Sequence, residues 1–187
     1  MKIGLFFGTF NPIHVGHVQI ALSLFKAHPI DQIWFIITPL SPFKKDQQIT
    51  SKEHRLNMVS LALEKYNNLL PSVLEFELDS PNYTCDTLRY IKLKFPHYQF
   101  VILMGSDNYL DISKWKDHQY ILDNFQICVY DRSEHRPSIN KNMLYIEGEY
   151  INISSSQIRN DITSPRAHEL LNSKVSEYIR LHSLYNK

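Results

Sequence analysis

The chain has 187 residues, the size of one domain, and that length is enough to bury a full hydrophobic core. Apolar residues make up 43% and charged residues 21% of the sequence, as in an ordinary globular protein, and no run approaches the roughly 20 apolar residues of a membrane-spanning helix. The formal net charge of +1 excludes a global field that would attract a nucleic acid or a membrane surface, so any anion site must be local.

Short apolar runs alternate along the chain with longer amphipathic segments, a pattern that predicts strands alternating with helices. In chain order, the predicted elements are a strand at residues 2–7, a helix at 15–28, a strand at 32–39, a helix at 51–66, a strand at 73–78, a helix at 84–95, a strand at 98–105, short helices around 106–112 and 117–123, strands at 125–131 and 143–148, and helices at 154–162 and 173–185.

Some of these elements carry signals at single residues. Pro39 ends the second strand, and Ser51 can cap the helix that follows the loop-like stretch 40–51. Trp34 lies inside an apolar run and is expected in the core. The first helix is expected to bury a face formed by Val15, Val18, Ala21, Leu22 and Phe25.

The alternation of strands and helices predicts an α/β fold with a mostly parallel sheet of five to six strands and helices on both faces. We find no repeat or linker, so a single domain over residues 1–187 is expected, with the last helices, from about 154 to 187, packed as a C-terminal helical subregion. Parallel sheets bind ligands at the carboxyl ends of their strands, where the strand order reverses. The turn after the first strand is therefore the first candidate site.

That turn carries GTFNPIHVGH, from Gly8 to His17, and its features suit a phosphate. Gly8 permits close approach of a ligand to the backbone, and Thr9 offers a hydroxyl and an N–H. His14 and His17 lie on one face at the start of a helix, Gly16 leaves that face open, and the helix N-terminus adds a partial positive charge. Zinc is disfavoured because no third ligand is nearby, and a dehydrogenase because the GxGxxG fingerprint is absent.

The same stretch resembles the (H/T)xGH phosphate-binding motif of the nucleotidyltransferase superfamily. ISSSQIR at 153–159 resembles that superfamily's second signature, ISSTxIR, with Ser156 in place of the threonine. In between, SPNYTCDTL at 80–88 and GSDNYLDISKWKDHQYIL at 105–122 resemble the SxYTxDTL and GxDxxxxxxxWxxxxxIL segments of bacterial nicotinate-nucleotide adenylyltransferases. The resemblance covers nearly the whole chain and implies a Rossmann-like nucleotidyltransferase fold.

The resemblance implies transfer of the adenylyl group of ATP to nicotinate mononucleotide, giving nicotinate adenine dinucleotide and pyrophosphate in NAD biosynthesis. The attacking phosphate monoester is already mostly dianionic at neutral pH, because its second pKa is about 6, so it needs no general base. Catalysis then rests on positioning and charge stabilisation. Mg²⁺ is implied as the companion of ATP, held mainly by the triphosphate, and no metal site made of protein side chains is expected.

The resemblance also implies which residues act. His14 and His17 are the catalytic pair, donating hydrogen bonds to the ATP phosphates and to the charge that develops at the α-phosphorus. The residues implied to bind ATP are Gly8, Thr9, Phe10, Gly16, Lys44, Gly105, Asp107, Ser154, Ser155, Ser156 and Arg159. The residues implied to bind the mononucleotide are Tyr83, Thr84, Trp115 and Arg55.

Several of these residues have a simpler interpretation beside the functional one. Asp107 either accepts a hydrogen bond from a ribose hydroxyl or caps the helix at 106–112. Phe10 is expected mainly to pack, and Trp115 to stack on the pyridine ring. Lys44 matches the family's loop after the second strand, but Phe43 stands where the family often has a histidine.

Two other functions stay open. One is a related adenylyltransferase that uses another phosphate acceptor, either nicotinamide mononucleotide or phosphopantetheine. The other is a nucleotide-binding module without turnover, against which the intact His14, His17 and Arg159 argue. The segment from Tyr83 to Thr87 does not separate acid from amide by charge, because recognition there can run through the backbone.

The expected setting is the cytoplasm. The first apolar run, residues 3–7, is too short for a signal-peptide core, and the lone Cys85 and Cys128 form no C-x-x-C pattern, so reduced thiols are expected. The expected partners are small-molecule substrates, without nucleic acid or membrane. The sequence leaves a homo-oligomer open.

Overall fold

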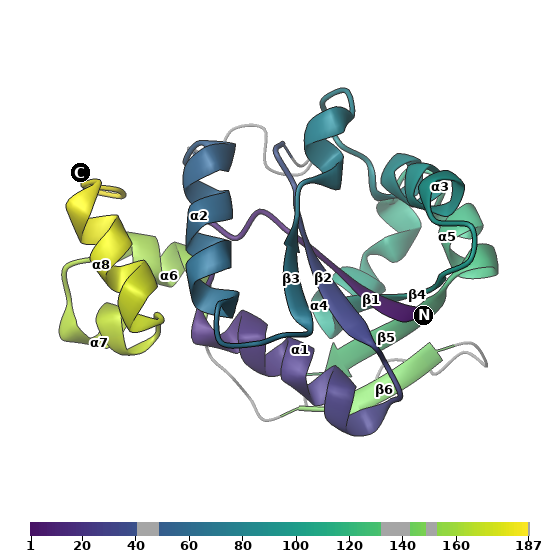
Figure 1. Cartoon of the computed structure of the whole chain (residues 1–187), viewed down its shortest axis with the longest axis horizontal. Coiled ribbons are helices and arrows are strands. Elements are labelled where there is room, and N and C mark those ends of the chain that lie inside the picture. Colours follow the sequence, from purple (N-terminus) through teal and green to yellow (C-terminus); the bar gives the residue numbers. More distant parts are fainter. Residues whose placement is uncertain (41–48, 132–142, 149–152, 187) are drawn as a thin grey trace.

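A six-stranded sheet forms the centre of the computed structural model, which describes residues 1–40, 49–131, 143–148 and 153–186 (Figure 1). The spatial order of the strands is β3-β2-β1-β4-β5-β6, and every neighbouring pair is parallel. The strands are β1 (Lys2–Gly8), β2 (Gln32–Ile37), β3 (Leu69–Ser72), β4 (Gln99–Gly105), β5 (Gln126–Asp131) and β6 (Met143–Glu147). This confirms the predicted mostly parallel α/β fold, with a reversal of strand order between β1 and β4.

Helices cover both faces of the sheet. In Figure 1, α2 lies to the left of the strands, α1 lies below them, and α3 and α5 lie to the right, while α6, α7 and α8 lie outside α2 at the C-terminal end. The helices are α1 (Val15–Ala27), α2 (Lys52–Leu63), α3 (Thr84–Lys94), α4 (Ser106–Leu110), α5 (His118–Asn124), α6 (Ser155–Asn160), α7 (Pro165–Glu169) and α8 (Ser173–Leu181), with short 3₁₀ helices η2 (Leu74–Glu77) and η3 (Ile112–Lys114). No helix among the described residues is long and apolar enough to cross a membrane.

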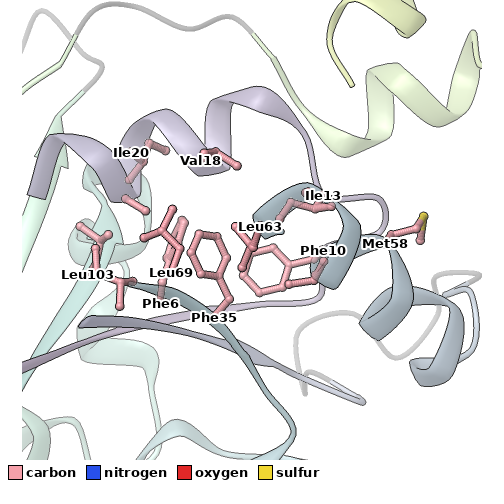
Figure 2. Packing of buried hydrophobic residues seen from close by; sticks show 14 of the residues in the cluster. Phe6, Phe10, Ile13, Val18, Ile20, Phe35, Met58, Leu63, Leu69 and Leu103 are labelled. Carbon is pink, nitrogen blue, oxygen red and sulfur yellow. The ribbon is translucent and has the colours of Figure 1, made fainter. Parts of the chain in front are cut away.

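The two faces of the sheet carry separate hydrophobic clusters. Along β1 the side chains alternate, so that Ile3 and Leu5 join the cluster under α3 and α5, whereas Phe6 joins the cluster under α1 and α2. Figure 2 shows the second cluster, in which the rings of Phe6, Phe10 and Phe35 pack together beneath α1. This aromatic packing anchors the end of β1, where the chain turns into the loop that precedes α1.

The predicted third strand is wrong. Residues 69–72 form the strand instead, and 74–77 form the 3₁₀ helix η2. β3 is an edge strand, so Pro71 costs it no hydrogen bond that a central strand would need. The alternation at 73–78 was misleading because Glu75 is buried, with 1% of its surface exposed, although a half-buried strand would turn it toward water.

Two further expectations need correction, and one helix was missed. The buried side of α1 consists of Gly16, Val18, Ile20, Ala21 and Leu24, whereas Val15, Leu22 and Phe25 are only partly buried at its margin. Trp34 is also partly buried, with its ring against Phe95, Tyr98 and Phe100 at the border of the core. The short helix α7, which begins with Pro165 and is capped by Ser164, was not predicted.

Candidate functional site

A cavity of about 680 Å³ opens where the strand order reverses. Segments from four distant parts of the chain line it: the loop after β1, the start of α3, the stretch after β4, and the start of α6. The predicted site residues that line it are Gly8, Thr9, Phe10, His14, His17, Tyr83, Thr84, Gly105, Trp115, Ser154, Ser155, Ser156 and Arg159. The structure therefore gathers most of the predicted set around one cavity.

The two histidines form a close pair at the start of α1, with their ring planes tilted by 32°. His14 is the N-cap residue, and its backbone N–H donates to Nδ1 of His17 at 3.2 Å. The two ring centroids are 3.7 Å apart. A nitrogen that accepts a hydrogen bond carries no proton, so the neutral His17 ring holds its proton on Nε2 and presents that group as a donor. Helix geometry thus selects the tautomer that can donate to a phosphate oxygen.

Gly8 and Phe10 shape the floor beneath this pair. Phe10 has a left-handed backbone (φ 45°) and is 2% exposed, and its ring centroid lies 5.1 Å from that of His17. A Cβ on Gly8 would lie 2.8 Å from the Phe10 ring, closer than van der Waals contact allows. Gly8 therefore leaves room for a ring that supports His17, which agrees with the expectation that Phe10 mainly packs.

The second signature lies directly against the first. Ser154 caps α6 in a reciprocal arrangement with Gln157, whose backbone N–H donates to the Ser154 hydroxyl oxygen at 3.2 Å. Ser155 Oγ donates to the Pro12 carbonyl oxygen at 2.9 Å. Arg159 Nη1 donates to the Asn11 carbonyl oxygen at 2.7 Å. These bonds join two segments about 145 residues apart into one wall, which collects hydroxyl, imidazole and guanidinium donors suited to a polyphosphate.

The other end of the cavity is built around the start of α3. Tyr83 is the N-cap residue of this helix and Thr84 its first residue. Trp115 lies half-buried at the end of η3, and the neighbouring Lys116 places its Nζ 4.7 Å from the centroid of the Tyr83 ring. An aromatic platform beside a helix N-terminus suits a flat heteroaromatic ring that carries an anionic group.

Arg55 does not line this cavity. It is 1% exposed, and its guanidinium donates to four carbonyl oxygens, those of Thr50 at 2.9 Å, Thr9 at 2.8 Å, Thr38 at 2.7 Å and Pro39 at 3.1 Å. Burial lowers its pKa from the ordinary value. The expectation that Arg55 binds the mononucleotide is corrected on this geometry: Arg55 ties the loop after β1 to the loop after β2 from behind.

Two other predicted residues, Gly16 and Asp107, are not among the residues that line the cavity. Gly16 is buried in the first turn of α1. Asp107 is exposed in the first turn of α4, whose N-cap is Gly105, so the alternative that Asp107 caps this helix is wrong. Lys44 and Phe43 lie outside the described residues.

Some residues of the wall were not anticipated. Asn11 lines the cavity, and its Oδ1 accepts from the Thr50 N–H at 3.2 Å and from the Tyr185 hydroxyl at 2.9 Å. Glu75 also lines it, accepts from the Thr87 hydroxyl at 2.7 Å, and has its pKa raised by burial. The sequence around Asn11 offers only the Asn-Pro pair as a signal. The hydrogen-bond partners of Asn11 and Glu75 lie in other elements, so the sequence does not reveal them.

The described residues contain no group of three or more His, Cys, Asp and Glu side chains placed to hold a metal ion. The end of the cavity between the start of α1 and the start of α6, called the phosphate end below, carries imidazole, hydroxyl and guanidinium side chains. Such groups fit the oxygens of a phosphate, so a divalent cation at this end would depend on the phosphates themselves for most of its ligands.

Comparison with known proteins agrees with this geometry. A family model described as cytidylyltransferase-like matches residues 5–161. A curated relative from Flavobacterium johnsoniae, named "probable nicotinate-nucleotide adenylyltransferase", is 41% identical and covers 100% of both chains, and a relative of the same name from Cytophaga hutchinsonii is 37% identical over 99% of this chain and 98% of its own. The solved structure of Plasmodium falciparum nicotinic acid mononucleotide adenylyltransferase complexed with NaAD matches with a TM-score of 0.80 at 23% identity, covering 98% of this chain and 97% of that chain, which supports the fold.

Proposed function

The chain belongs to the cytidylyltransferase-like family and, within it, to the nicotinate-nucleotide adenylyltransferases, and we propose how its own residues carry out that reaction. The enzyme transfers the adenylyl group of ATP to nicotinate mononucleotide and releases pyrophosphate, a step of NAD biosynthesis. The observation that carries the assignment of roles is the junction of the two signatures, in which Arg159 and Ser155 bond the loop of the histidine pair.

The phosphate end binds ATP. The Nε2–H of His17 and the ring of His14 donate to the α-phosphate, where negative charge develops during the reaction. Ser154, Ser156 and Arg159 hold the β- and γ-phosphates, and the backbone at Gly8 and Thr9 approaches the nucleotide closely. Donors fixed before the reaction cost no reorganisation, and each can contribute about 3 kcal/mol to transition-state stabilisation.

The other end binds the mononucleotide. Trp115 stacks on the pyridine ring, and the N–H groups at Tyr83 and Thr84 face its carboxylate. This places the mononucleotide phosphate between the two ends, in line with the α-phosphorus and the departing pyrophosphate. Because that phosphate is already ionised, no residue has to remove a proton, and the chain supplies orientation and charge stabilisation.

Mg²⁺ bound to the triphosphate of ATP would supply positive charge that stabilises the pyrophosphate leaving group. The chain's donors hold phosphate oxygens and leave the metal to the triphosphate. The small-molecule substrates are the partners of this site, and the protein works in the cytoplasm.

The test measures pyrophosphate release by the purified protein with ATP, Mg²⁺ and each acceptor in turn: nicotinate mononucleotide, nicotinamide mononucleotide and phosphopantetheine. We expect release with nicotinate mononucleotide at a higher kcat/KM than with either of the others. Release that favours phosphopantetheine would point to the related family, and no release with any acceptor would contradict the proposal.

A further inference from the structure

Lys116 is a cation held by two contacts at the mononucleotide end of the cavity. It lines the cavity beside Trp115 and Tyr83. Its Nζ donates to Asp86 Oδ2 at 2.8 Å and lies 4.7 Å from the centroid of the Tyr83 ring. A lysine side chain is normally flexible, but these two contacts fix the position of the ammonium against the wall of the site.

The Asp86 carboxylate is shared, so it does not cancel the charge of Lys116 by itself. Asp86 Oδ1 accepts from Arg89 at 3.3 Å, and Arg89 also bonds Asp117 at 2.9 Å. An ammonium has three N–H donors, and the bond to Asp86 engages one of them. The hydrogen bond that Lys116 donates to Asp86 raises the pKa of Lys116, so the group stays protonated at neutral pH.

A second source of positive potential lies next to this ammonium. α3 begins at Thr84, directly after Tyr83, and its 11 residues give its N-terminus a partial positive charge. The ammonium over the Tyr83 ring and the start of this helix therefore lie at the same end of the cavity as Trp115. An anionic substituent on a ring stacked against Trp115 would be favoured there over a neutral one of the same shape.

We propose that Lys116 determines specificity for the acid over the amide form of the mononucleotide, through a hydrogen bond from its Nζ to the pyridine carboxylate. This inference rests on the proposed function and deepens it, because it names the charge that separates the two acceptors. A charge-assisted bond to a carboxylate is about twice as strong as a bond to a neutral carbonyl. The carboxamide also offers N–H donors, which an ammonium cannot accept.

Lys114 provides a matched control within the same segment. It also lines the cavity, and its Nζ pairs with Asp111 at 2.6 Å, but its side chain is 68% exposed against 47% for Lys116. A charge at Lys114 is therefore more fully screened by water, and its removal should leave acceptor choice nearly unchanged.

The experiment compares Lys116→Met, Lys116→Arg and Lys114→Met with the wild type. Methionine keeps the hydrocarbon stem over Tyr83 and removes the charge, while arginine keeps the charge. We expect Lys116→Met to lower kcat/KM for nicotinate mononucleotide by about tenfold or more, with less than about a twofold change for nicotinamide mononucleotide and for the KM of ATP. Lys116→Arg should retain most of the preference, and Lys114→Met all of it.

Equal losses for acid and amide in Lys116→Met would show that Lys116 only holds the wall together and would overturn the inference, as would an unchanged preference. Titration of each protein with the two mononucleotides, followed by calorimetry, tests the same point without turnover. If the wild type released no pyrophosphate, the proposed function would fail, whereas a carboxylate-selective affinity lost in Lys116→Met would still support the role of Lys116.

Discussion

At the scale of single residues, His17 owes its chemistry to its position in α1. The His14 N–H donates to Nδ1 of His17, and the ring of Phe10 packs edge-on against it. Both contacts fix the ring with Nε2–H as its donor. A neutral donor held in this way suits charge stabilisation and is poorly suited to proton removal.

Replacing His17 by alanine should lower kcat at least about 100-fold, because one preorganised donor to the developing charge is lost. Steady-state pyrophosphate release measures the effect, and circular dichroism checks that the fold persists. Ser23→Ala is the control, since Ser23 lies on the same helix, does not line the cavity, and donates its hydroxyl to the Gln19 carbonyl oxygen. A kcat near that of the wild type, with ATP still bound, would remove His17 from the mechanism.

Glu75 shows a buried acid whose charge opposes folding. Burial raises its pKa above the ordinary 4.5, so the folded chain holds this proton more tightly than the unfolded chain. The free energy of unfolding therefore decreases as the pH rises from the ordinary value toward the raised one. Glutamine is neutral throughout and can still accept the Thr87 hydroxyl through its own carbonyl oxygen.

Glu75→Gln should therefore unfold at a higher urea concentration than the wild type near about pH 8, with the gain shrinking toward about pH 5. Urea denaturation at both pH values, followed by tryptophan fluorescence, measures this. An equal loss of stability at both values would indicate that the exchange disturbs packing and that the charge of Glu75 contributes little.

At the scale of elements, the start of α6 closes the phosphate end. Arg159 reaches back to the Asn11 carbonyl oxygen and also donates to Ser156 Oγ at 3.1 Å. The guanidinium thus aligns two segments that both line the cavity. We expect Arg159 to contribute more to the binding of ATP than to the binding of the mononucleotide, because the mononucleotide end of the cavity is built from α3 and η3.

Arg159→Gln is expected to raise the KM of ATP by about tenfold, with a much smaller change in the KM of nicotinate mononucleotide. Initial rates with each substrate varied in turn separate the two constants. Arg166→Gln, at an exposed position on α7, serves as the matched loss of an arginine. Equal rises in both KM values would contradict the assignment of Arg159 to the ATP end.

The same scale shows where sequence reasoning succeeds and fails. Strongly apolar runs such as 98–105 predict their strands well, because a central strand of a parallel sheet is buried on both faces. β3 is misplaced, since an edge strand of four residues with an internal proline carries almost no pattern. The resemblance implies a binding role for Arg55, but only the tertiary structure reveals the four carbonyl oxygens that surround its guanidinium.

At the scale of the whole molecule, the site depends on contacts between an N-terminal loop and the C-terminal segments of the chain. The loop after β1 contacts α6 through Arg159, and the Tyr185 hydroxyl reaches Asn11 from near the C-terminus, where burial raises the pKa of Tyr185 to about 12. The sequence predicts that the loop after β1 and the start of α6 share one site, because each segment resembles a signature of the same superfamily. The sequence does not predict the hydrogen bond between Tyr185 and Asn11, because a single tyrosine in a C-terminal segment forms no recognisable pattern.

The central claim is that this assembled cavity joins the mononucleotide phosphate to the α-phosphorus of ATP. The most direct measurement gives the protein ATP with radiophosphorus at the α position, together with nicotinate mononucleotide and Mg²⁺, and separates the products by chromatography. We predict that the label appears in nicotinate adenine dinucleotide in a one-to-one ratio with released pyrophosphate. Label recovered only in AMP, or only in unreacted ATP although ATP binds, would contradict the account.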